Sequence, residues 1–591
     1  MKADRILHRS LCSVVFALCG VVAVSAGGCS QQGQSQSDMS ANVGDGMSNS
    51  DDGGTVIPPG PGDHHVSDAV LATLTNLASS TRGRTWNPTN ENSLADDWLI
   101  QSPASSWGQL YAQLPVPTAC SGAGCNADFG LRACTTQADC TLGGTCTEVA
   151  ATMTTPGATP GKLCVGHSDS VYDQMYKVMV SAQRYVDVTS LLPPDGRFLS
   201  AMRNAVTYLS RTNQSVQVRF IFGNYPVQGA VDTRAVLDAL TRDLQSGSAI
   251  KVSVGTYRSS NVPPSWNHSK IVAADGKAVI FGGHNLWDQH YLGKNPVHDI
   301  SIRLRGPGAV DAHAFANEQW KYTCDNQSLT YCTTGSVCSN TWSGGNVATR
   351  QCLPMVPLAS LTPDKPGDVR AVAIGRLARI DPANMSNQAD TAFLTMLGAA
   401  KSTIRMAQQD LGPLKLGGVA TGSWPDALWA QLGAAIVRGV EVYIVLSNKD
   451  SVAGGLTATD ASYSNGWTLD EVGVNLRTYI EKNPPPGAPT GAALRDLICR
   501  KIHLAPFRFS TEDTFPGGVP LPLHAKFVMI DDQAFYIGSQ NQYDAGLTEF
   551  GYLIDDARPA AIVVSSYWNK MWGQSVRKAI SGSDAPACNL R

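Results

Sequence analysis

The sequence predicts an α/β protein of two similar halves, each a mixed, largely parallel β-sheet flanked by helices, with one active site formed between them. Two observations support this. The same order of strand and helix patterns occurs twice after residue 170, and each half contains one copy of the same spaced group of His, Lys, Asp, Gly and Asn. Strands that alternate with helices are typical of helix-covered sheets, and an internal repeat indicates two related units.

The order of elements follows from hydrophobic periodicity. In the first half, a helix pattern at 172–182 precedes strands and helices expected at 185–191 (strand), Leu199–Leu209 (helix), 216–222 (strand), Ala235–Leu244 (helix), 250–254, 270–274, 278–283 and 300–304 (strands), and a helix ending near Trp320. The second half repeats the order at Ala389–Ala400 (helix), 403–411 (strand), Ala427–Arg438 (helix), 440–447 (strand), Leu469–Ile480 (helix), 525–530, 534–539 and 550–554 (strands). We therefore expect halves at 67–345 and 346–591.

The N-terminus has the pattern of an export signal. Basic residues precede a short apolar run at Leu11–Val24 that ends in small residues, which predicts a signal peptide at 1–28. Cys29 in the sequence AGGC is a candidate lipid anchor, and cleavage after Ala26 by an ordinary signal peptidase is the alternative. Both predict a protein outside the cytoplasm, either lipid-anchored to the cell envelope or secreted. Residues 29–66, rich in Gln, Ser, Asp, Gly and Pro, predict a disordered tether.

Cysteine usage also indicates an oxidising compartment. The chain has 15 cysteines, and three of them precede residue 30, which leaves an even number for disulfides. Six lie in a predicted insertion at 118–165, four lie between Cys324 and Cys352, and Cys499 and Cys588 remain to pair with each other. A metal site is the competing interpretation. It is disfavoured because no CxxC pair occurs and no His sits among the clustered cysteines at ligand spacing.

Overall charge provides no attraction to polyanions. Lys and Arg number 45 against 48 Asp and Glu, which gives a net charge of -3. Nucleic-acid binding draws much of its affinity from phosphate neutralisation by basic residues, so composition gives no support for a nucleic-acid partner, and none is expected. We expect a monomer.

The chemistry is carried by two matched motifs. The segments HSKIVAAD…GGHN and HAKFVMID…GSQN both separate the first His from the last Asn by 17 positions (268 to 285 and 524 to 541). Matched spacing in otherwise different segments makes coincidence a poor explanation. The motif residues are His268, Lys270, Asp275, Gly282, Gly283 and Asn285 in the first half, and His524, Lys526, Asp531, Gly538, Ser539 and Asn541 in the second half.

This arrangement suits a phosphodiester. Residues i and i+2 of a strand share a face, so the His and Lys of each motif point the same way. One neutral imidazole attacks phosphorus, and the other donates a proton to the leaving oxygen and later accepts one from water or an alcohol. The lysines and asparagines donate to the non-bridging oxygens. No metal or cofactor is needed, and the symmetry of the motifs leaves open which His attacks.

Four acids accompany the motifs. Asp299 and Glu549 follow the first and second motif, and an acid bonded to one imidazole nitrogen fixes the tautomer and stabilises the imidazolium. Asp275 and Asp531 lie at strand ends, five residues after each lysine, so we expect them to be structural. The Gly282–Gly283 and Gly538–Ser539 pairs end a strand and allow close backbone approach.

Simpler interpretations stand beside the catalytic one. A lone HxK is as often a surface pair, but two matched copies favour catalysis over a degenerate, inactive site. Four aromatics beside the motifs could form a rim for a choline cation, although ordinary packing is the favoured interpretation; they are Trp266, Trp287, Tyr291 and Tyr543.

Both motifs resemble those of the phospholipase D superfamily, and their context resembles the secreted bacterial phospholipases D. The shared segments include VDVTSLLPP, SWNHSK, GPGAVDAHAF, QQDL and AFYIGSQN, and the likeness runs from Val171 to the C-terminus. The resemblance implies a two-halved α/β sandwich and a phosphohistidine intermediate, with His268 as nucleophile and His524 as general acid/base. It also implies that the substrate is a glycerophospholipid such as phosphatidylcholine at a membrane surface, with water or an alcohol as acceptor. Glu549 stands where Asp is common in that group.

Two other functions remain open from the sequence. The first is a secreted nuclease or other phosphodiesterase with the same site. The second is a non-catalytic surface protein that reuses the fold to bind phospholipid.

Overall fold

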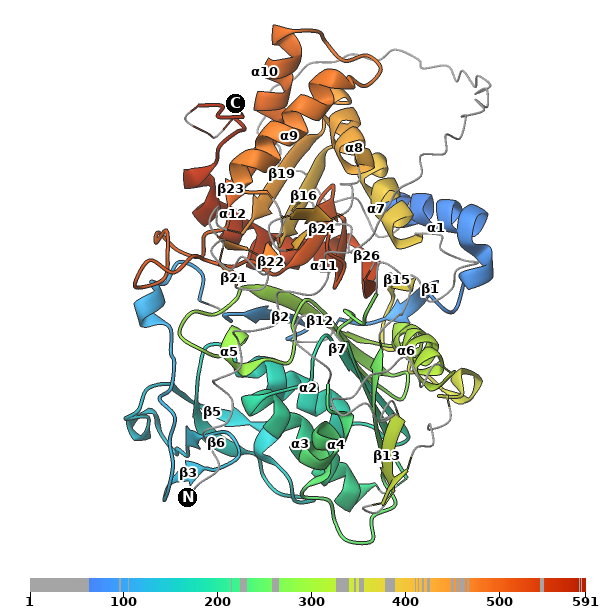
Figure 1. Cartoon of the computed structure of the whole chain (residues 1–591), viewed down its shortest axis with the longest axis vertical. Coiled ribbons are helices and arrows are strands. Elements are labelled where there is room, and N and C mark those ends of the chain that lie inside the picture. Colours follow the sequence, from blue (N-terminus) through green and yellow to red (C-terminus); the bar gives the residue numbers. More distant parts are fainter. Residues whose placement is uncertain are drawn as a thin grey trace, which may run out of the picture. The chain divides into compact units, whose positions relative to one another are not determined.

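The computed structural model describes residues 63–590 except 95–96, 105, 214, 224–230, 258–264, 326–339, 345–346, 350–354, 378–387, 410, 413, 417–418, 422–425, 448–450, 453–455, 458–462, 465–466, 543–546, 584 and 586 (Figure 1). The predicted signal peptide, Cys29 and the tether up to residue 62 lie outside the described residues, as do Tyr543 and the three cysteines that follow Cys324. The helix α1 begins at His65, inside the last two residues of the predicted tether.

The first large sheet has nine strands in the order β14-β13-β9-β8-β7-β10-β11-β12-β2. Strands β7, β8 and β9 run parallel, and every other neighbouring pair is antiparallel. The bounds are β2 Leu99–Ser102, β7 Tyr185–Ser190, β8 Gln217–Gly223, β9 Lys251–Tyr257, β10 Ile271–Ala274, β11 Ala278–Gly282, β12 Asp299–Arg305, β13 Asn340–Gly344 and β14 Val347–Thr349.

The second large sheet has eight strands in the order β1-β15-β26-β25-β24-β16-β19-β23. Here β16, β19 and β23 run parallel, and the remaining pairs are antiparallel. The bounds are β1 Trp86–Asn92, β15 Val369–Leu377, β16 Thr403–Gln408, β19 Glu441–Leu446, β23 Ile502–Pro506, β24 Lys526–Ile530, β25 Ala534–Gly538 and β26 Thr548–Asp555. The order β9-β8-β7-β10-β11-β12 corresponds to β23-β19-β16-β24-β25-β26, so the internal repeat predicted from the sequence is confirmed.

The fold class is confirmed as two mixed sheets flanked by helices, but the expectation that the sheets are largely parallel is wrong. The reason is local. The motif aspartates Asp275 and Asp531 lie in the tight turns of the hairpins β10–β11 and β24–β25, with φ of 53° and 56°. Asp and Asn tolerate this left-handed conformation better than most residues, and a two- or three-residue turn can join only antiparallel strands.

Helices flank the sheets (Figure 1); the predicted ones occur in the expected order, whereas α5, α10, α11 and α12 were not predicted. Those of the first half are α2 Ser170–Val180, α3 Gly196–Thr212, α4 Thr233–Thr241, the short α5 Asp288–Tyr291 and α6 Gly308–Asp325. Those of the second half are α7 Gln388–Ala399, α8 Asp426–Val437, α9 Leu469–Lys482, α10 Ala492–Lys501, α11 Ala557–Val563 and α12 Asn569–Ser575. At α9, Thr468 and Glu471 form the reciprocal side-chain to backbone bonds of a capping box, which fixes where that helix begins.

Buried side chains alternate between two environments along the motif strands. In β10, Val272 packs among the helices of the first half, whereas Ile271 lies in a cluster shared by both sheets. In β24, Val528 packs among the helices of the second half, and Phe527 lies in the same shared cluster. A strand that is buried on both faces reads as an unbroken apolar run, which both motifs contain. The shared cluster holds the two motif-bearing strands in one core.

The N-terminal elements cross between the two sheets. Helix α1 (His65–Ala78) packs against α7, and β1 pairs with β15 of the second sheet, whereas β2 pairs with β12 of the first sheet. Residues 65–92 therefore pack with the second sheet although they precede the first in sequence. The predicted boundary between residues 345 and 346 stays a prediction.

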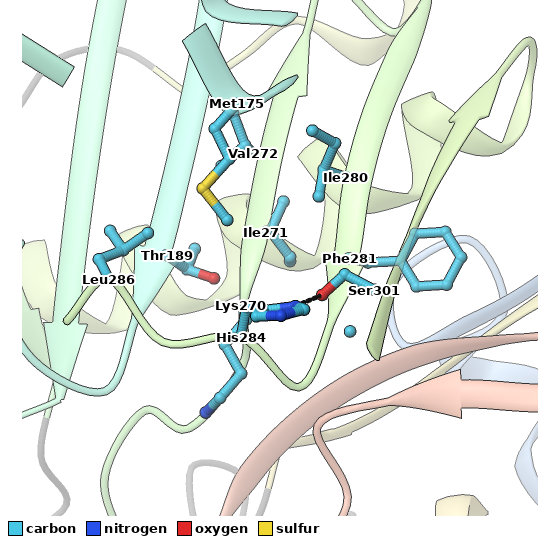
Figure 2. Close-up of a pocket in the computed structure, with 11 residues that line it drawn as sticks. Met175, Thr189, Lys270, Ile271, Val272, Ile280, Phe281, His284, Leu286 and Ser301 are labelled. Atoms are coloured by element: carbon cyan, nitrogen blue, oxygen red, sulfur yellow. Dashed lines mark hydrogen bonds between the residues drawn. The ribbon is translucent and has the colours of Figure 1, made fainter. Parts of the chain in front are cut away.

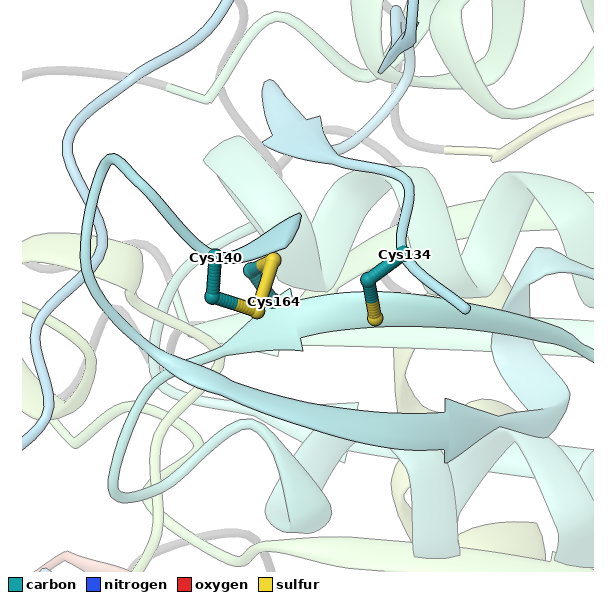
Figure 3. Close-up of side chains that lie close together, drawn as sticks. All are labelled: Cys134, Cys140 and Cys164. Carbon is teal, nitrogen blue, oxygen red and sulfur yellow. A yellow bond between two sulfur atoms is a disulfide. The ribbon is translucent and has the colours of Figure 1, made fainter. Parts of the chain in front are cut away.

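Disulfides hold the Cys-rich insertion and the C-terminus. The insertion contains the short strands β3 Cys125–Asn126, β4 Leu131–Arg132, β5 Thr145–Val149 and β6 Gly161–Val165. Its bonds are Cys120–Cys125, Cys134–Cys146 and Cys140–Cys164. The sulfurs of Cys134, Cys140 and Cys164 lie within 4.8 Å of one another (Figure 3), but all three are in disulfides and therefore are not thiolate ligands. The Cys499–Cys588 pair anticipated from the cysteine count is confirmed.

Short strands complete the second half: β17 Leu414–Leu416, β18 Val419–Thr421, β20 Ser451–Val452, β21 Leu456–Thr457 and β22 Tyr463–Ser464. Among the helices that the structure describes, none combines the length and the apolar character that a membrane crossing requires.

Candidate active site

Each motif histidine lies just before a central strand, where a backbone bridge ties it to the other half. Asn267, beside His268, forms an isolated parallel bridge with Thr548, and the N–H of His268 donates to the Thr548 carbonyl at 2.9 Å. In the same way, the N–H of His524 donates to the carbonyl of His298 at 2.8 Å. The two bridges place each histidine beside the acid-bearing strand of the opposite half.

The acids are consequently exchanged between the halves. His268 Nδ1 bonds Glu549 Oε2 at 2.9 Å, and His524 Nδ1 bonds Asp299 Oδ2 at 2.7 Å. All four side chains are buried, at 5% exposure or less. With both Nδ1 atoms engaged by carboxylates, each ring has only Nε2 free to react with a substrate, and a proton on Nδ1 is the tautomer that makes Nε2 a nucleophile or base.

The motif lysines are buried, and their ammonium groups are held by hydrogen bonds. Lys270 Nζ donates to the His268 carbonyl at 2.6 Å. Lys526 Nζ donates to the His524 carbonyl and to Gln409 Oε1, the latter at 2.8 Å. Gln409 lies in the QQDL segment just after β16, and its contact with Lys526 was not predicted. An uncharged amide beside a buried ammonium directs its N–H groups without neutralising it.

Asn285 is buried with its side-chain amide unpartnered within the described part of the chain. Its side chain is 1% exposed, and neither Oδ1 nor Nδ2 has a hydrogen-bond partner among the residues that the structure describes. A buried amide without partners is costly, so such groups are normally satisfied by water or ligand. Asn541, at the matched position of the second motif, is also buried, at 3% exposure.

The small residues after β11 and β25 make room for the acids. A Cβ on Gly283 would lie 1.9 Å from Asp299 Oδ1, so this position excludes any side chain. The matched position of the second motif is Ser539, whose hydroxyl donates to Glu549 Oε2 at 2.6 Å. Gly538 is equally closed, since a Cβ there would approach the Gly551 Cα to 2.8 Å. Gly282–Gly283 therefore leaves room for Asp299, whereas Gly538–Ser539 provides a hydroxyl that bonds Glu549.

The motif aspartates lie away from the histidines and organise the backbone. Asp275 accepts from the N–H groups of Gln183, Arg184 and Tyr185. Asp531 accepts from the N–H groups of 401 and 402, just before β16, and of Thr403, its first residue. Each carboxylate thus fastens the start of a central strand to the motif hairpin, a geometry that supports the expected structural role.

This role predicts a stability effect. Asp531→Ala leaves three N–H groups without their acceptor and removes a residue suited to positive φ, so we expect a loss of about 2–4 kcal/mol in the free energy of unfolding. Asp532→Ala is the matched control, because it also removes a residue at positive φ but otherwise only a half-exposed ion pair with Arg405, and it should cost less than Asp531→Ala. Urea unfolding measures both. Equal losses would contradict the role, as would a fall in turnover by the folded Asp531→Ala protein.

Of the four aromatic residues beside the motifs, Tyr291 and Trp266 are buried packing elements. Tyr291 is fully buried, its hydroxyl donates to Asp299 Oδ2 at 2.9 Å, and it accepts from the Asn285 N–H at 3.1 Å. It therefore joins the acid of one pair to the strand end that carries Asn285, a function that its sequence position did not reveal. Trp266 is buried, Trp287 is partly exposed, and Tyr543 lies outside the described residues.

A small apolar pocket reaches the first motif. It is lined mainly by α2, β10 and β11, together with Lys270, His284 and Ser301. Figure 2 shows His284 bonded to Ser301, at 2.7 Å, and the ammonium of Lys270 directed away from Met175 and Ile280. The aliphatic part of the Lys270 side chain thus lies along the apolar pocket, and its ammonium group points away from that pocket.

Burial sets the protonation states. Desolvation lowers the pKa of His268 to about 4, against the opposing charge of Glu549, and desolvation together with Lys526 and Lys270 holds the pKa of His524 well below its ordinary value. Desolvation also lowers the pKa of Lys270 to about 8. The influence of both lysines and of His268 on the pKa of His524 shows that the two motifs form one electrostatic site.

Comparison with known proteins agrees with this geometry. A family profile described as "Cardiolipin synthase, PLD-like domain" matches residues 393–572, which include the second motif. The chain is 27% identical over 583 residues to the phospholipase D of Streptomyces antibioticus, covering 90% of each chain. It is 25% identical over 187 residues to cardiolipin synthase A of Pseudomonas putida (strain GB-1), or 31% of this chain and 30% of that one.

Among solved structures, phosphatidylserine synthase of Haemophilus influenzae Rd KW20 aligns with a TM-score of 0.43 and 12% identity, over 69% of this chain and 85% of that one. By the near full-length sequence match and the family profile, with both motifs assembled into one buried site, the chain is similar to the phospholipase D superfamily, and these similarities support a phosphodiesterase or phospholipid-modifying enzyme.

Proposed function

We propose that this chain is a phospholipase D that cleaves the head-group phosphodiester of glycerophospholipids such as phosphatidylcholine, through a phosphohistidine. The observation that carries the proposal is the pair of exchanged histidine–carboxylate contacts, His268–Glu549 and His524–Asp299, in one buried site. The similarity to a phospholipase D over 90% of both chains favours a lipid substrate over a nucleic acid.

The proposed reaction has two balanced steps. In the first, Nε2 of His268 bonds to phosphorus, the bond from phosphorus to the head-group oxygen breaks, and that oxygen takes a proton from Nε2 of His524. In the second, His524 takes a proton from water or an alcohol, whose oxygen bonds to phosphorus as the bond to His268 breaks. The anionic phosphodiester itself favours protonation of His524 when it binds.

The remaining site residues hold charge. The ammonium groups of Lys270 and Lys526 and the amides of Asn285 and Asn541 would donate to the non-bridging phosphate oxygens, where the transition state concentrates negative charge. Two histidines perform the nucleophilic and proton-transfer roles, so the proposed reaction uses no metal or cofactor.

The substrate assignment is tested by head-group release. Protein without residues 1–28 is mixed with phosphatidylcholine vesicles and EDTA, and free choline is measured. Choline release that persists in EDTA supports a metal-independent phospholipase D. Cleavage of single-stranded DNA without choline release would favour the nuclease, and binding to vesicles with neither reaction would favour a non-catalytic lipid-binding protein. An added alcohol that appears in the lipid product measures transfer against hydrolysis.

The pKa shifts predict a bell-shaped pH dependence. His268 must be neutral to attack, so kcat/KM should fall as the pH drops through about 4; Lys270 must be charged, so it should fall again as the pH rises through about 8. Initial rates on a p-nitrophenyl phosphodiester, whose leaving group needs no proton from His524, measure both limbs where circular dichroism shows folded protein. Lys270→Arg should move the alkaline limb upward, and an unmoved limb would assign it to another group.

A further inference from the structure

The two histidine–carboxylate pairs share a geometry but have different neighbours. Asp299 receives hydrogen bonds from neutral donors, the Tyr291 hydroxyl and the Ile300 N–H. Among the described residues, no Lys or Arg forms an ion pair with it. Glu549 has a hydroxyl donor in Ser539, but its other oxygen, Oε1, lies 3.7 Å from a guanidinium nitrogen, Nη2 of Arg376.

The strand register puts Arg376 in that place. Arg376 of β15 is the direct antiparallel partner of Glu549 in β26, so their side chains share one face of the sheet. The guanidinium is 7% exposed, and it is fixed by donation to the Leu547 carbonyl at 3.0 Å and to Asp390 Oδ1 at 2.9 Å. A planar, permanently charged group held by these two hydrogen bonds keeps its position and its charge.

One carboxylate therefore faces two cationic partners whenever His268 is protonated. The charge of Arg376 lowers the pKa of Glu549, as do its contacts with His268, although burial opposes them. A carboxylate already paired with a fixed cation stabilises an imidazolium less than an unshared carboxylate does. Asp299 has no such competing cation among the described residues, so it can support a proton on His524 once a bound anionic phosphodiester offsets the lysines that lower the pKa of His524.

We propose that Arg376 makes the two otherwise symmetric pairs unequal, so that His268 is kept as the neutral attacking imidazole and His524 is left as the proton carrier. Arg376 acts through Glu549 and is thus a positioning residue. The inference rests on the proposed phosphohistidine reaction and adds to it a reason, within this chain, for the division of roles.

The inequality also bears on the second step. The phosphorylated ring of His268 carries positive charge that Glu549 stabilises, and breaking its bond to phosphorus returns a neutral imidazole. Arg376 weakens the stabilisation of that charged ring, so it should speed the departure of His268 when water or an alcohol attacks. The proton from that acceptor goes to His524, whose imidazolium Asp299 supports.

Several charged groups face His268, and each is held constant by the choice of variants. Glu549 raises its pKa, whereas Lys270 and Lys526 lower it. Around His524 the corresponding groups are Asp299, Lys526, Lys270, His268 and His290. Changes confined to Arg376 leave these groups in place.

The test compares Arg376→Met and Arg376→Gln with Arg376→Lys. We expect both neutral variants to raise the acid-side apparent pKa of kcat/KM on bis(p-nitrophenyl) phosphate by about one unit, a tenfold change in proton affinity, and to slow decay of the phosphoenzyme. Gln retains donors for the Leu547 carbonyl, which protects the test if Met fails to fold. Arg376→Lys retains the cation, so its acid-side apparent pKa of kcat/KM should stay near the wild-type value.

Asp390→Asn is the matched structural control, since it breaks a contact of Arg376 and leaves the cation beside Glu549. It should destabilise the protein without raising the acid-side apparent pKa of kcat/KM. An acid limb that rises as far in Asp390→Asn as in Arg376→Met, or that is unmoved in both folded neutral variants, would overturn the proposal.

A second readout separates this inference from the proposed function. Histidine-selective ¹⁵N NMR of the full folded protein, without substrate, follows the titration of His268 directly, with its resonance assigned from His268→Ala. A rise in its pKa in Arg376→Gln supports the inequality even if neither phosphatidylcholine nor the soluble diester is turned over, an outcome that would defeat only the proposed function. An unchanged titration overturns the role of Arg376.

Discussion

Replacement of either His268 or His524 by alanine is expected to lower steady-state phosphodiester cleavage by about 10⁴-fold or more, because neither of the two steps can proceed without both imidazoles. Choline release from vesicles measures the loss. His503→Ala is the matched control, since His503 is a buried histidine of the same half that bonds Glu441 and lies on β23, at the edge of the sheet. It should keep turnover in the folded fraction.

The two alanine variants should differ on an activated substrate. A p-nitrophenyl phosphodiester releases a stable phenolate and needs no proton from His524. We therefore expect His524→Ala to give one burst of p-nitrophenol per active site and to accumulate phosphoenzyme, whereas His268→Ala gives no burst. A burst from His268→Ala alone would reverse the roles, and near wild-type turnover by either variant would contradict the shared site.

The exchange of acids between halves predicts a second large effect. Asp299→Asn and Glu549→Gln should each lower turnover of phosphatidylcholine by about 10²–10⁴-fold, because an amide cannot stabilise the imidazolium and can hold the wrong tautomer. The burst separates them. Asp299 serves His524, so Asp299→Asn should leave the burst rate on the activated substrate near normal. Glu549 serves His268, so Glu549→Gln should slow the burst itself.

Pairing within each half would give the opposite result. Asp299 would then serve His268, and Asp299→Asn would slow the burst while Glu549→Gln spared it. Glu549→Asp is an informative companion variant. Ser539 occupies the position that matches Gly283, and its hydroxyl bonds Glu549, whereas Gly283 leaves room for Asp299. We therefore expect an aspartate at 549 to lose part of the contact with His268. The Glu549→Asp variant should recover only part of the activity.

Much of the fold could be predicted from local pattern. The strands β7, β8, β10, β11, β24 and β25 and the helices α3, α7, α8 and α9 lie where apolar periodicity places them. The strands β15 and β23 were not anticipated, although both are buried members of the second sheet. Their pairing depends on partners far along the chain, and no nearby turn signals it. The direction of the strands was missed for a related reason: the Asp-containing turns were not interpreted as hairpins.

The site divides in the same way. The sequence by itself determined the chemistry, because the types and spacing of His, Lys and Asn in two matched copies suffice to propose a phosphodiester site. Only the tertiary structure decided which acid serves which histidine, since that depends on two backbone bridges between residues about 225 and 280 positions apart. It also brought Arg376, a residue of an unpredicted strand, against Glu549 through β-sheet register. Local sequence fixes what a side chain can do, whereas long-range pairing fixes what it faces.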